Sequence, residues 1–448
     1  MANELTAWRI PSDAAIRSLL IERIERERNG IGIVVGVVDG DGRRIVTHGV
    51  LAEGDPRSLD GDTVFEIGSI TKVFTGLVLA DMVEHGEVRL DDPVARYLPA
   101  GVTLPERGGR QITLIDLATH TSGLPRWPDD IAPGDLSPKD WSNPYADYSV
   151  EQLHAFLSGY RLRRDIGAAH AYSNLGMGLL GRALTHRAGL DFETLVQERI
   201  TGPLGMASTA IDLSADLMAR FAIGHDQGRR QVAAWDMPTF AGAGALHSTA
   251  NDLLTFLAAE LGYADTPLKG AMAAQTRSRR TGGADYVQAL AWRIEPDPAG
   301  EIVWHGGATG GFRCFALFDA TRRAGVVMLT NSASDRNDDI PFHLLNGRAL
   351  KAAPPERVAI QLEAAALEPL VGHYRFSDAR FLFVTREHDR LFAQLTGQWR
   401  FEVYPESRVD FFWRIADARI RFEFGPDGAV TGLTVSQNGR ELQAKRVA

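Results

Sequence analysis

Ser69 and Lys72 stand three residues apart in the stretch FEIGSITKVFTG (65–76), where a strand-like run passes into an apolar, helix-like run. A serine hydroxyl is a weak nucleophile until a nearby base removes its proton, and residues three apart share one face of a helix. Desolvation in such a helix would lower the pKa of Lys72 and make its neutral amine accessible. At a helix N-terminus, the N–H of Ser69 and the helix dipole would also stabilise an oxyanion. The pattern predicts an activated serine, and an ordinary polar helix start is the alternative.

Lysine is rare in this arginine-rich chain, which strengthens the interpretation of Lys72. The sequence contains five lysines, and only Lys72 has a serine three positions before it. Because an unpaired charge among apolar residues is costly, a lysine inside an apolar helix needs a specific role.

Two further polar motifs follow along the chain. Tyr172-Ser173-Asn174 is the only Tyr-x-Asn sequence in the protein. A tyrosine whose proton is held off by a lysine can act as a general base, and Asn174 could hold Lys72 and bond a substrate carbonyl. His305-Gly306-Gly307 ends a predicted strand, where glycines let a substrate backbone lie against the sheet edge. Taken singly, a polar helix start and a glycine turn are the simpler interpretations.

Together and in this order, the three motifs resemble those of the penicillin-binding-protein and class C β-lactamase superfamily of serine hydrolases. That superfamily carries Ser-x-x-Lys, then Tyr-x-Asn, then Lys-Thr-Gly or a variant such as His-x-Gly. The resemblance covers roughly residues 15–335. Four further stretches agree with it: HTSGLP (120–125), GPLGM (202–206), GALHSTANDL (244–253) and LTNS (329–332).

The resemblance implies a role for each motif residue. Ser69 would be the nucleophile, and Lys72 and Tyr172 the proton-transfer pair, with the choice of acylation base between these two left open. An acyl-enzyme would form and be hydrolysed by a water activated from the Tyr172 side. The N–H groups of Ser69 and Ala308 would form the oxyanion hole. The implied substrate-binding residues are Asn174, His305, Gly306, Gly307 and Ala308.

His305 departs from the lysine of Lys-Thr-Gly, which in the superfamily helps to hold the carboxylate of a β-lactam or D-alanyl peptide. A histidine with an unperturbed pKa near 6.5 is only partly charged at neutral pH. Members with histidine or tryptophan here include carboxylesterases and D-aminopeptidases or amidases. We therefore expect a carboxylesterase or D-aminopeptidase that cleaves small esters or amides. The alternatives are a β-lactamase or DD-carboxypeptidase, and a catalytically silent binding module with the same fold.

A loop at about residues 124–148 is rich in proline, tryptophan and aspartate, and is longer than most loops of compact domains. If this loop lines the site, its carboxylates would favour an amine-bearing substrate. If the carboxylates face water, they have no such role. The aspartates in question are Asp129, Asp130, Asp135, Asp140 and Asp147.

The elements that must position these residues follow from hydrophobic patterning. Residues 12–30 predict an amphipathic helix, and two β-rich runs around DGDG predict a hairpin over 31–49. Residues 69–85 predict a helix buried on every side. The pattern between about 90 and 295 is mostly helical, and strand character returns at 301–304, 313–319 and 324–330.

This order of elements predicts an α+β fold, an α/β sandwich in which helices flank an antiparallel sheet. With an all-helical insertion, it is a β-lactamase/transpeptidase-like domain over residues 1–350. Residues 351–366 predict a linker. Residues 367–448 alternate in short runs between turns, which predicts a small antiparallel β-barrel resembling a lipocalin.

Composition limits the classes of partner. The 448 residues carry a net charge of −9 with no basic stripe, which argues against nucleic acid. No apolar run reaches membrane-spanning length, and no signal peptide is recognisable, so a cytoplasmic protein is expected. With one cysteine, Cys314, and no His-Glu-x-x-His, the sequence predicts no metal and no cofactor. The expected partner is a small ester, amide or short peptide, and a homo-oligomer is left open.

Overall fold

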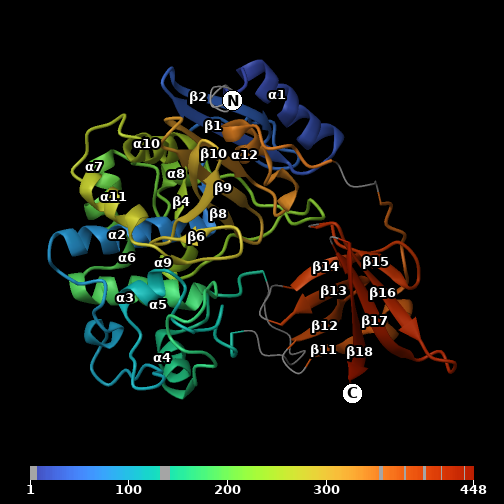
Figure 1. Ribbon diagram of the computed structural model, residues 1–448. Helices are drawn as coiled ribbons and strands as arrows, with labels where there is room; N and C mark the ends of the chain where they lie inside the picture. Colours follow the sequence, from blue (N-terminus) through green and yellow to red (C-terminus); the bar gives the residue numbers. More distant parts are fainter. Residues whose placement is uncertain are drawn as a thin grey trace. The chain divides into compact units, whose positions relative to one another are not determined.

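The computed structural model describes residues 8–131, 142–352, 357–377, 380–396, 400–414, 416–437 and 439–447. The chain divides into two compact units (Figure 1). The larger unit contains residues 8–131, 142–333 and 337–350. The second unit, called the barrel unit, contains Ser334–Arg336 and the described residues from 351 onward. Within the described residues, no helix combines the length and the apolar character needed to cross a bilayer.

An eight-stranded antiparallel sheet forms the centre of the larger unit, and its strands come from both ends of that unit. The N-terminal hairpin pairs with the last strand, so that Ile33 lies opposite Thr330. In spatial order the strands are β2 (Gly42–Gly49), β1 (Gly32–Asp39), β10 (Ala324–Thr330), β9 (Arg313–Asp319), β8 (Gly300–Ala308), β7 (Arg293–Asp297), β6 (Val287–Gln288) and β5 (Arg280–Thr281). This assembly confirms the predicted hairpin and the predicted sheet.

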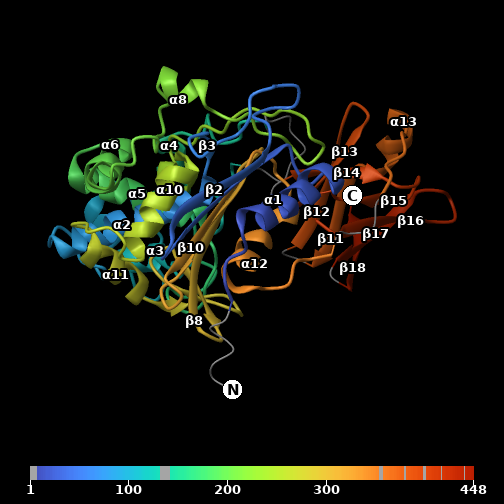
Figure 2. The same cartoon turned by 90° about the horizontal axis from the view of Figure 1, so that it is seen from above.

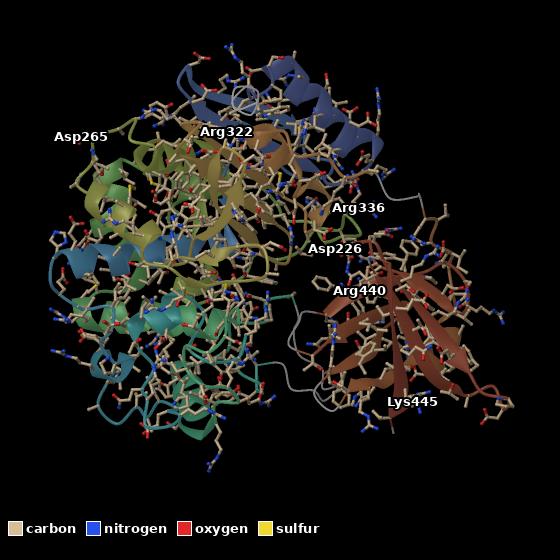
Figure 3. All side chains as sticks on the ribbon, viewed as in Figure 1. Asp226, Asp265, Arg322, Arg336, Arg440 and Lys445 are labelled. Carbon is tan, nitrogen blue, oxygen red and sulfur yellow. The ribbon has the colours of Figure 1, made fainter. Side chains whose placement is uncertain are left out.

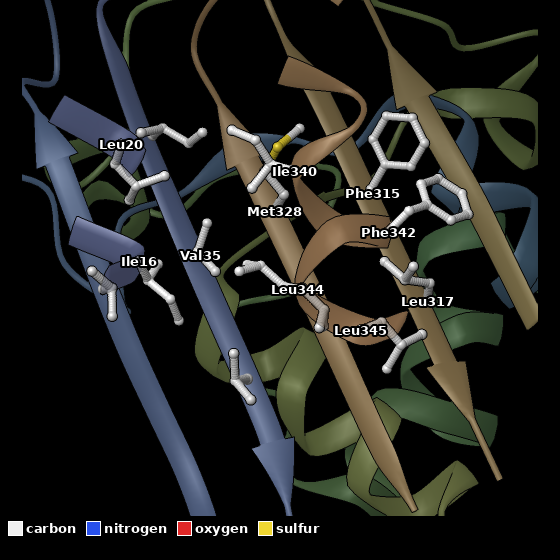
Figure 4. Close-up of a cluster of buried hydrophobic side chains, with 14 of the residues drawn as sticks. Ile16, Leu20, Val35, Phe315, Leu317, Met328, Ile340, Phe342, Leu344 and Leu345 are labelled. Atoms are coloured by element: carbon white, nitrogen blue, oxygen red, sulfur yellow. The ribbon is translucent and has the colours of Figure 1, made fainter. Parts of the chain in front are cut away.

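One face of the sheet is covered by α1 (Asp13–Ile21) and α12 (Ile340–Asn346) (Figure 2). Figure 4 shows the apolar layer between them and the strands. Ile16 and Leu20 of α1 are fully buried, as the predicted amphipathic stripe requires. The layer also contains Val35, Phe315, Leu317, Met328, Ile340, Phe342, Leu344 and Leu345.

The opposite face of the sheet is covered by α2 (Thr71–Glu84), α10 (Ala250–Glu260) and α11 (Lys269–Arg277) (Figure 2). Every residue of α2 from Thr71 to Met82 is buried, as its apolar sequence predicts. Ser69 itself lies just before α2, in the 3-10 turn Gly68–Ile70, which the sequence did not predict. The N–H of Ile70 donates to the Ile67 carbonyl over 3.1 Å, a tighter closure than an α-helix would make.

The remaining helices of the larger unit belong mostly to the insertion between β2 and β5. They are α3 (Leu114–Ala118), α4 (Val150–Gly159), α5 (Asn174–Ala188), α6 (Phe192–Val196), α7 (Gly202–Leu204), α8 (Ala215–Ala219) and α9 (Ala241–Gly244). A two-stranded sheet of β3 (Phe65–Glu66) and β4 (His247–Ser248) leads into the Ser69 turn. Helices α5 and α9 approach closely, since a Cβ on Gly181 would lie 3.0 Å from the Gly242 Cα.

Eight antiparallel strands close the barrel unit, which confirms the predicted C-terminal barrel. Along β16 buried and exposed residues alternate, so that alternate side chains fill an apolar interior. On β18, Ala444 is buried and Lys445 is exposed (Figure 3). A short helix, α13 (Ala364–Leu367), precedes the strands β11 (Gly372–Ser377), β12 (Arg380–Glu387), β13 (Arg390–Leu395), β14 (Arg400–Pro405), β15 (Asp410–Phe412), β16 (Ala418–Phe424), β17 (Val430–Gln437) and β18 (Arg440–Val447).

A buried ion pair ties the N-terminal helix to the C-terminal helix of the larger unit. Arg23 donates to Asp339, at the start of α12, over 2.7 Å, and both side chains are 4% exposed. Arg23→Ala would leave the Asp339 carboxylate buried without this partner, so we expect the free energy of unfolding to fall by about 3 kcal/mol or more. Urea denaturation measures this value. The exposed pair Arg26–Glu22 supplies the control, because Arg26→Ala should cost less than about 1 kcal/mol. An equal loss of unfolding free energy in Arg23→Ala and Arg26→Ala would contradict the stabilising role of the buried Arg23–Asp339 pair.

Candidate active site

The structure brings Ser69, Lys72 and Tyr172 together around one hydroxyl. The Lys72 Nζ donates to the Ser69 Oγ over 2.8 Å, and the Tyr172 hydroxyl donates to the same oxygen over 2.9 Å. Ser69 lies in the 3-10 turn before α2 and Lys72 lies in the first turn of α2, whereas Tyr172 lies just before α5. A nucleophile with two proton-accepting groups within hydrogen-bond reach can be activated by either of them.

Lys72 is fully buried, and its second partner is a backbone carbonyl. Its Nζ donates to the Ala243 carbonyl of α9 over 2.5 Å. Neighbouring polar residues of α2 hold the same segment, because the Thr75 hydroxyl donates to the Gly242 carbonyl and the Thr71 hydroxyl accepts from the Leu246 N–H. The buried amine is therefore oriented by a fixed carbonyl on one side and by the nucleophile on the other.

Asn174 occupies the first turn of α5 and is 6% exposed. Its backbone N–H donates to the Arg126 carbonyl, and Ser173 caps the helix by accepting from the Gly176 N–H. Among the described residues, no hydrogen bond joins the Asn174 side chain to Lys72. The Ala243 carbonyl instead fills the holding role that the sequence suggested for Asn174, which leaves substrate contact as the role still predicted for this amide.

Protonation in this group is shaped by burial and by cations. Burial lowers the pKa of Lys72, and the nearby Arg126 and Arg293 lower it further, although Tyr172 opposes this. Burial raises the pKa of Tyr172, but Lys72, Arg293 and the hydrogen bond with Ser69 outweigh it and bring this pKa below its ordinary value. Both groups therefore release a proton more readily than free side chains would. The deprotonated form of either group can accept the Ser69 proton.

The end of β8 lies directly against the nucleophile turn. A Cβ on Gly307 would overlap the Ile67 carbonyl oxygen and would stand 3.3 Å from the Ser69 nitrogen. A Cβ on Gly68, whose φ is +47°, would stand 2.9 Å from the Ala308 nitrogen. The backbones of Ser69 and Ala308 are thus adjacent, as the predicted oxyanion hole requires. Any side chain at Gly307 would separate them.

His305 is buried on β8, with an exposed fraction of 1%. Its Nδ1 lies 2.8 Å from the Gly306 carbonyl and so carries the proton. Burial, Arg293 and Lys72 hold the pKa of His305 well below its ordinary value. The neutral ring then presents Nε2 as an acceptor, and among the described residues this atom has no hydrogen-bond partner. Unlike a lysine, His305 cannot donate a charged hydrogen bond to a substrate carboxylate.

The aspartates of the 124–148 loop are only partly described. Asp129 and Asp147 are exposed, and Asp129 lies 3.9 Å from Arg163. Asp130 is exposed too and accepts from the Tyr148 hydroxyl over 2.9 Å. Asp135 and Asp140 lie outside the described residues. The described carboxylates make no contact with Ser69 or Tyr172.

Two arginines near Tyr172 were not identified from the sequence. The guanidinium carbons of Arg126 and Arg293 lie 5.2 and 5.3 Å from the centre of the Tyr172 ring. Arg126 directly follows the HTSGLP stretch, so its position could have signalled a place at the site. Arg293 lies in no motif, and no sequence pattern distinguishes it from other arginines. Within the described residues, no group of histidine, cysteine, aspartate and glutamate side chains could hold a metal ion.

Glu66 is a buried carboxyl next to the nucleophile turn. It accepts from the Thr309 hydroxyl and from the Trp235 N–H, each over 2.6 Å. Burial raises its pKa to about 7, although both hydrogen bonds act in the opposite direction. Through Thr309, Glu66 connects the strand before Ser69 to the residue that follows Ala308.

The larger unit and the barrel unit each match a known family. Residues 20–347 match the family described as Beta-lactamase, and residues 356–446 match a domain of unknown function, DUF3471. The D-alanyl-D-alanine-carboxypeptidase/endopeptidase AmpH of Escherichia coli K12 is 33% identical over 232 residues, 50% of this chain and 56% of that protein. The chain thus spans about half the length of that relative. Penicillin-binding protein 4* of Bacillus subtilis strain 168 is 25% identical over 95% of this chain and 97% of that protein.

Solved structures confirm the predicted fold class. The class C beta lactamase from Rhodobacter sphaeroides aligns with a TM-score of 0.64 at 28% identity, covering 74% of this chain and 98% of that chain. A beta-lactamase/D-alanine carboxypeptidase from Yersinia pestis aligns with a TM-score of 0.61 over the same share of each chain. At 24% identity, the second likeness concerns the fold alone.

Gly307→Ala tests the contact between β8 and the nucleophile turn. The new methyl group would push Ala308 away from Ser69, so we expect kcat/KM for an activated ester to fall by about 100-fold or more. Steady-state kinetics, with a thermal melt to confirm folding, measure this. Gly306→Ala is the control, because its methyl would meet only the edge of the Phe315 ring, at 3.0 Å, and should cost far less. Parental activity in folded Gly307→Ala would refute the oxyanion-hole assignment.

Glu66→Gln tests the buried carboxyl by its pH dependence. Glu66 ionises near 4.5 when unfolded and at about 7 when folded, so the folded state binds more protons between these values. Glu66 should therefore contribute a loss of stability of about 3 kcal/mol at most as pH rises from about 4.5 to about 7, and this contribution should be absent from Glu66→Gln. Urea denaturation across this range gives the difference between the two proteins. Exposed Glu106→Gln should keep the parental slope, and the same slope in Glu66→Gln would exclude a raised pKa.

Proposed function

The chain belongs to the beta-lactamase family of serine hydrolases, and we propose that it hydrolyses small carboxylic esters or amides through an acyl-Ser69 intermediate. The observation that carries this proposal is the convergence of Lys72 and Tyr172 on the Ser69 Oγ, at 2.8 and 2.9 Å. A silent binding module would have no need for a fully buried lysine at that place, because an uncompensated buried amine costs stability.

Acylation would begin when the Ser69 Oγ attacks the substrate carbonyl carbon. The hydroxyl proton would pass to the Lys72–Tyr172 pair, and the negative charge on the carbonyl oxygen would be stabilised by the N–H groups of Ser69 and Ala308. Collapse of the tetrahedral intermediate would break the bond to the leaving group. The leaving alcohol or amine would take the proton from the same pair.

Deacylation would repeat these steps with water in place of Ser69. A water next to Tyr172 would give its proton to the Lys72–Tyr172 pair and attack the acyl carbon. The second tetrahedral intermediate would then release the carboxylic acid and return the proton to the Ser69 Oγ. Because the pair ends as it began, the cycle needs no other proton carrier.

Among the candidate substrate classes, the charged groups around Tyr172 favour uncharged esters and hence carboxylesterase activity. The groups that surround the Tyr172 ring include the cations Lys72, Arg126 and Arg293, and no described carboxylate contacts that ring. An ammonium group on a D-aminopeptidase substrate would be repelled there. A neutral His305 is compatible with an uncharged ester, since it can only accept a hydrogen bond.

A β-lactam or D-alanyl peptide is the second candidate substrate. The observation that favours it is Arg126, an exposed cation beside the catalytic tyrosine that could pair with the carboxylate of such a substrate in place of the family's lysine. AmpH of Escherichia coli K12, which this chain resembles over 50% of its length, is named as a D-alanyl-D-alanine-carboxypeptidase/endopeptidase.

Removing the nucleophile or its lysine should abolish turnover. We expect Ser69→Ala and Lys72→Ala to lower kcat for p-nitrophenyl butyrate by about 1,000-fold or more, because each removes a member of one catalytic unit. The control is Lys269→Ala, an exposed lysine at the start of α11, which should keep parental activity. Intact-mass spectrometry should detect an acyl or fluorophosphonate adduct on Ser69 in the parent protein only.

Substrate preference is measured by comparing turnover of p-nitrophenyl butyrate with turnover of D-alanine p-nitroanilide and of nitrocefin. Faster ester cleavage would support the carboxylesterase assignment, and nitrocefin turnover at an equal rate would favour the β-lactam alternative. Full turnover in Ser69→Ala, or the absence of any adduct in the parent protein, would refute the acyl-enzyme proposal.

A further inference from the structure

Arg293, the first residue of β7, holds its guanidinium among three aromatic rings. Its guanidinium carbon lies 5.3 Å from the centre of the Tyr172 ring, 5.0 Å from that of Tyr286 and 4.9 Å from that of Trp304. We propose that Arg293 is a positioning residue that stabilises the phenolate of Tyr172 and thereby keeps this tyrosine available as a base. The inference rests on the proposed function, since it concerns the proton acceptor of the Ser69 reaction.

The charge of Arg293 has no counter-ion in the part of the chain that the structure describes. No carboxylate pairs with it there, and its buried Nε has no hydrogen-bond partner. Most other partly buried arginines of the larger unit have a carboxylate counter-ion. Arg322, for example, pairs with Asp297 and Asp319. A half-buried cation without an anion is costly, so an anion that forms next to it is strongly favoured. The phenolate of Tyr172 is such an anion.

The hairpin between β6 and β7 fixes the place of Arg293. Gln288 lies opposite Arg293 in the sheet, and its side-chain amide donates to the carbonyls of Ala289, Ala291 and Trp292. Ala291 adopts a left-handed φ of +70°, and its N–H donates to the Ala118 carbonyl. Across the other edge, Arg293 pairs with Trp304 on β8. Arg293 is therefore held by its backbone, in the position next to His305.

His305 cannot supply this cation itself. The ring donates from Nδ1 to the Gly306 carbonyl and is kept neutral by burial. Lys72 can supply a cation, but in the proposed cycle the same amine must also exchange the Ser69 proton. It is therefore neutral for part of that cycle. Arg126 lies as near to the Tyr172 ring as Arg293, but it is exposed, so that water screens its charge. Arg293 is the cation that stays charged throughout the cycle and is less exposed to water than Arg126.

The titratable and charged groups that face Tyr172 come from six parts of the larger unit. Burial alone would raise the pKa of Tyr172, and the cations reverse this effect. His120 and His305 are neutral, and Tyr145 and Tyr286 have raised pKa values because of burial, so none of these four offsets the cations. The groups are Lys72, His120, Arg126, Tyr145, Tyr286, Arg293 and His305.

The test compares Arg293→Gln and Arg293→Met, which remove the charge, with Arg293→Lys, which keeps it. The first readout is the pH dependence of the rate at which a fluorophosphonate labels Ser69, because this probe carries no carboxylate that Arg293 could bind. The second is the near-ultraviolet phenolate absorbance of Tyr172, taken as the difference between each protein and its Tyr172→Phe partner. This titration needs no turnover, so it stays informative if the acyl-enzyme proposal fails.

We expect the neutral variants to move the acid limb of the labelling profile, and the Tyr172 titration, upward by about one to two pH units. Arg293→Lys should restore most of the shift. Arg126→Gln, which removes the solvated cation at the same distance, should produce a clearly smaller shift. A thermal melt of each variant shows whether it is folded.

Three outcomes would overturn the proposal. If folded Arg293→Gln and Arg293→Met keep the parental Tyr172 titration, Arg293 does not act on the tyrosine. If the titration is unchanged and only KM for carboxylate-bearing substrates rises, Arg293 binds substrate instead. Slower labelling without a shift of the pH profile would indicate a purely structural role and would likewise refute the proposal.

Discussion

The burial of one amine, that of Lys72, sets conditions that much of the larger unit must meet. The amine is fully enclosed in a helix that is buried on all sides, and such a group is tolerated only if its hydrogen bonds are made. The carbonyl of Ala243 and the hydroxyl of Ser69 supply two of them. Burial also lowers the pKa of the amine, which is the property that the proposed proton transfer requires.

Meeting this condition requires backbone segments to approach one another unusually closely. Helix α9 reaches Lys72 because glycines on α5 and α9, Gly181 and Gly242, let the two helices touch. At the other side of the nucleophile, Gly68 and Gly307 bring β8 against the turn that carries Ser69. The close approach of backbone segments at these glycines thus serves two purposes. It encloses the lysine, and it places backbone N–H groups beside the serine.

Electrostatics around the site depart from what the family's Lys-Thr-Gly motif would give. A neutral histidine, His305, stands where the motif resemblance places that lysine, and positive charge is carried instead by Arg293 and Arg126 from other elements. The total charge near Tyr172 is therefore positive, as the proposed phenolate base would require, but its distribution differs. In the proposed mechanism, a substrate would meet a hydrogen-bond acceptor on β8, His305, and a cation at the exposed edge of the site, Arg126. This difference is the physical basis for expecting a substrate preference other than that of a typical β-lactamase.

Local patterns in the sequence were enough to predict several features of the site and the fold. Ser69-x-x-Lys72, Tyr172-x-Asn174 and His305-Gly306-Gly307 identified the centre, and periodicity identified the buried helix, the N-terminal hairpin and the C-terminal barrel. Three other features became visible only in the folded chain: the Ala243 carbonyl as partner of Lys72, the 3-10 turn at Ser69, and the place of Arg293 beside Tyr172. Helix and strand patterns arise from residues close in sequence. The partner of a buried charge, in contrast, depends on which distant segments pack against it, and no local pattern records that choice.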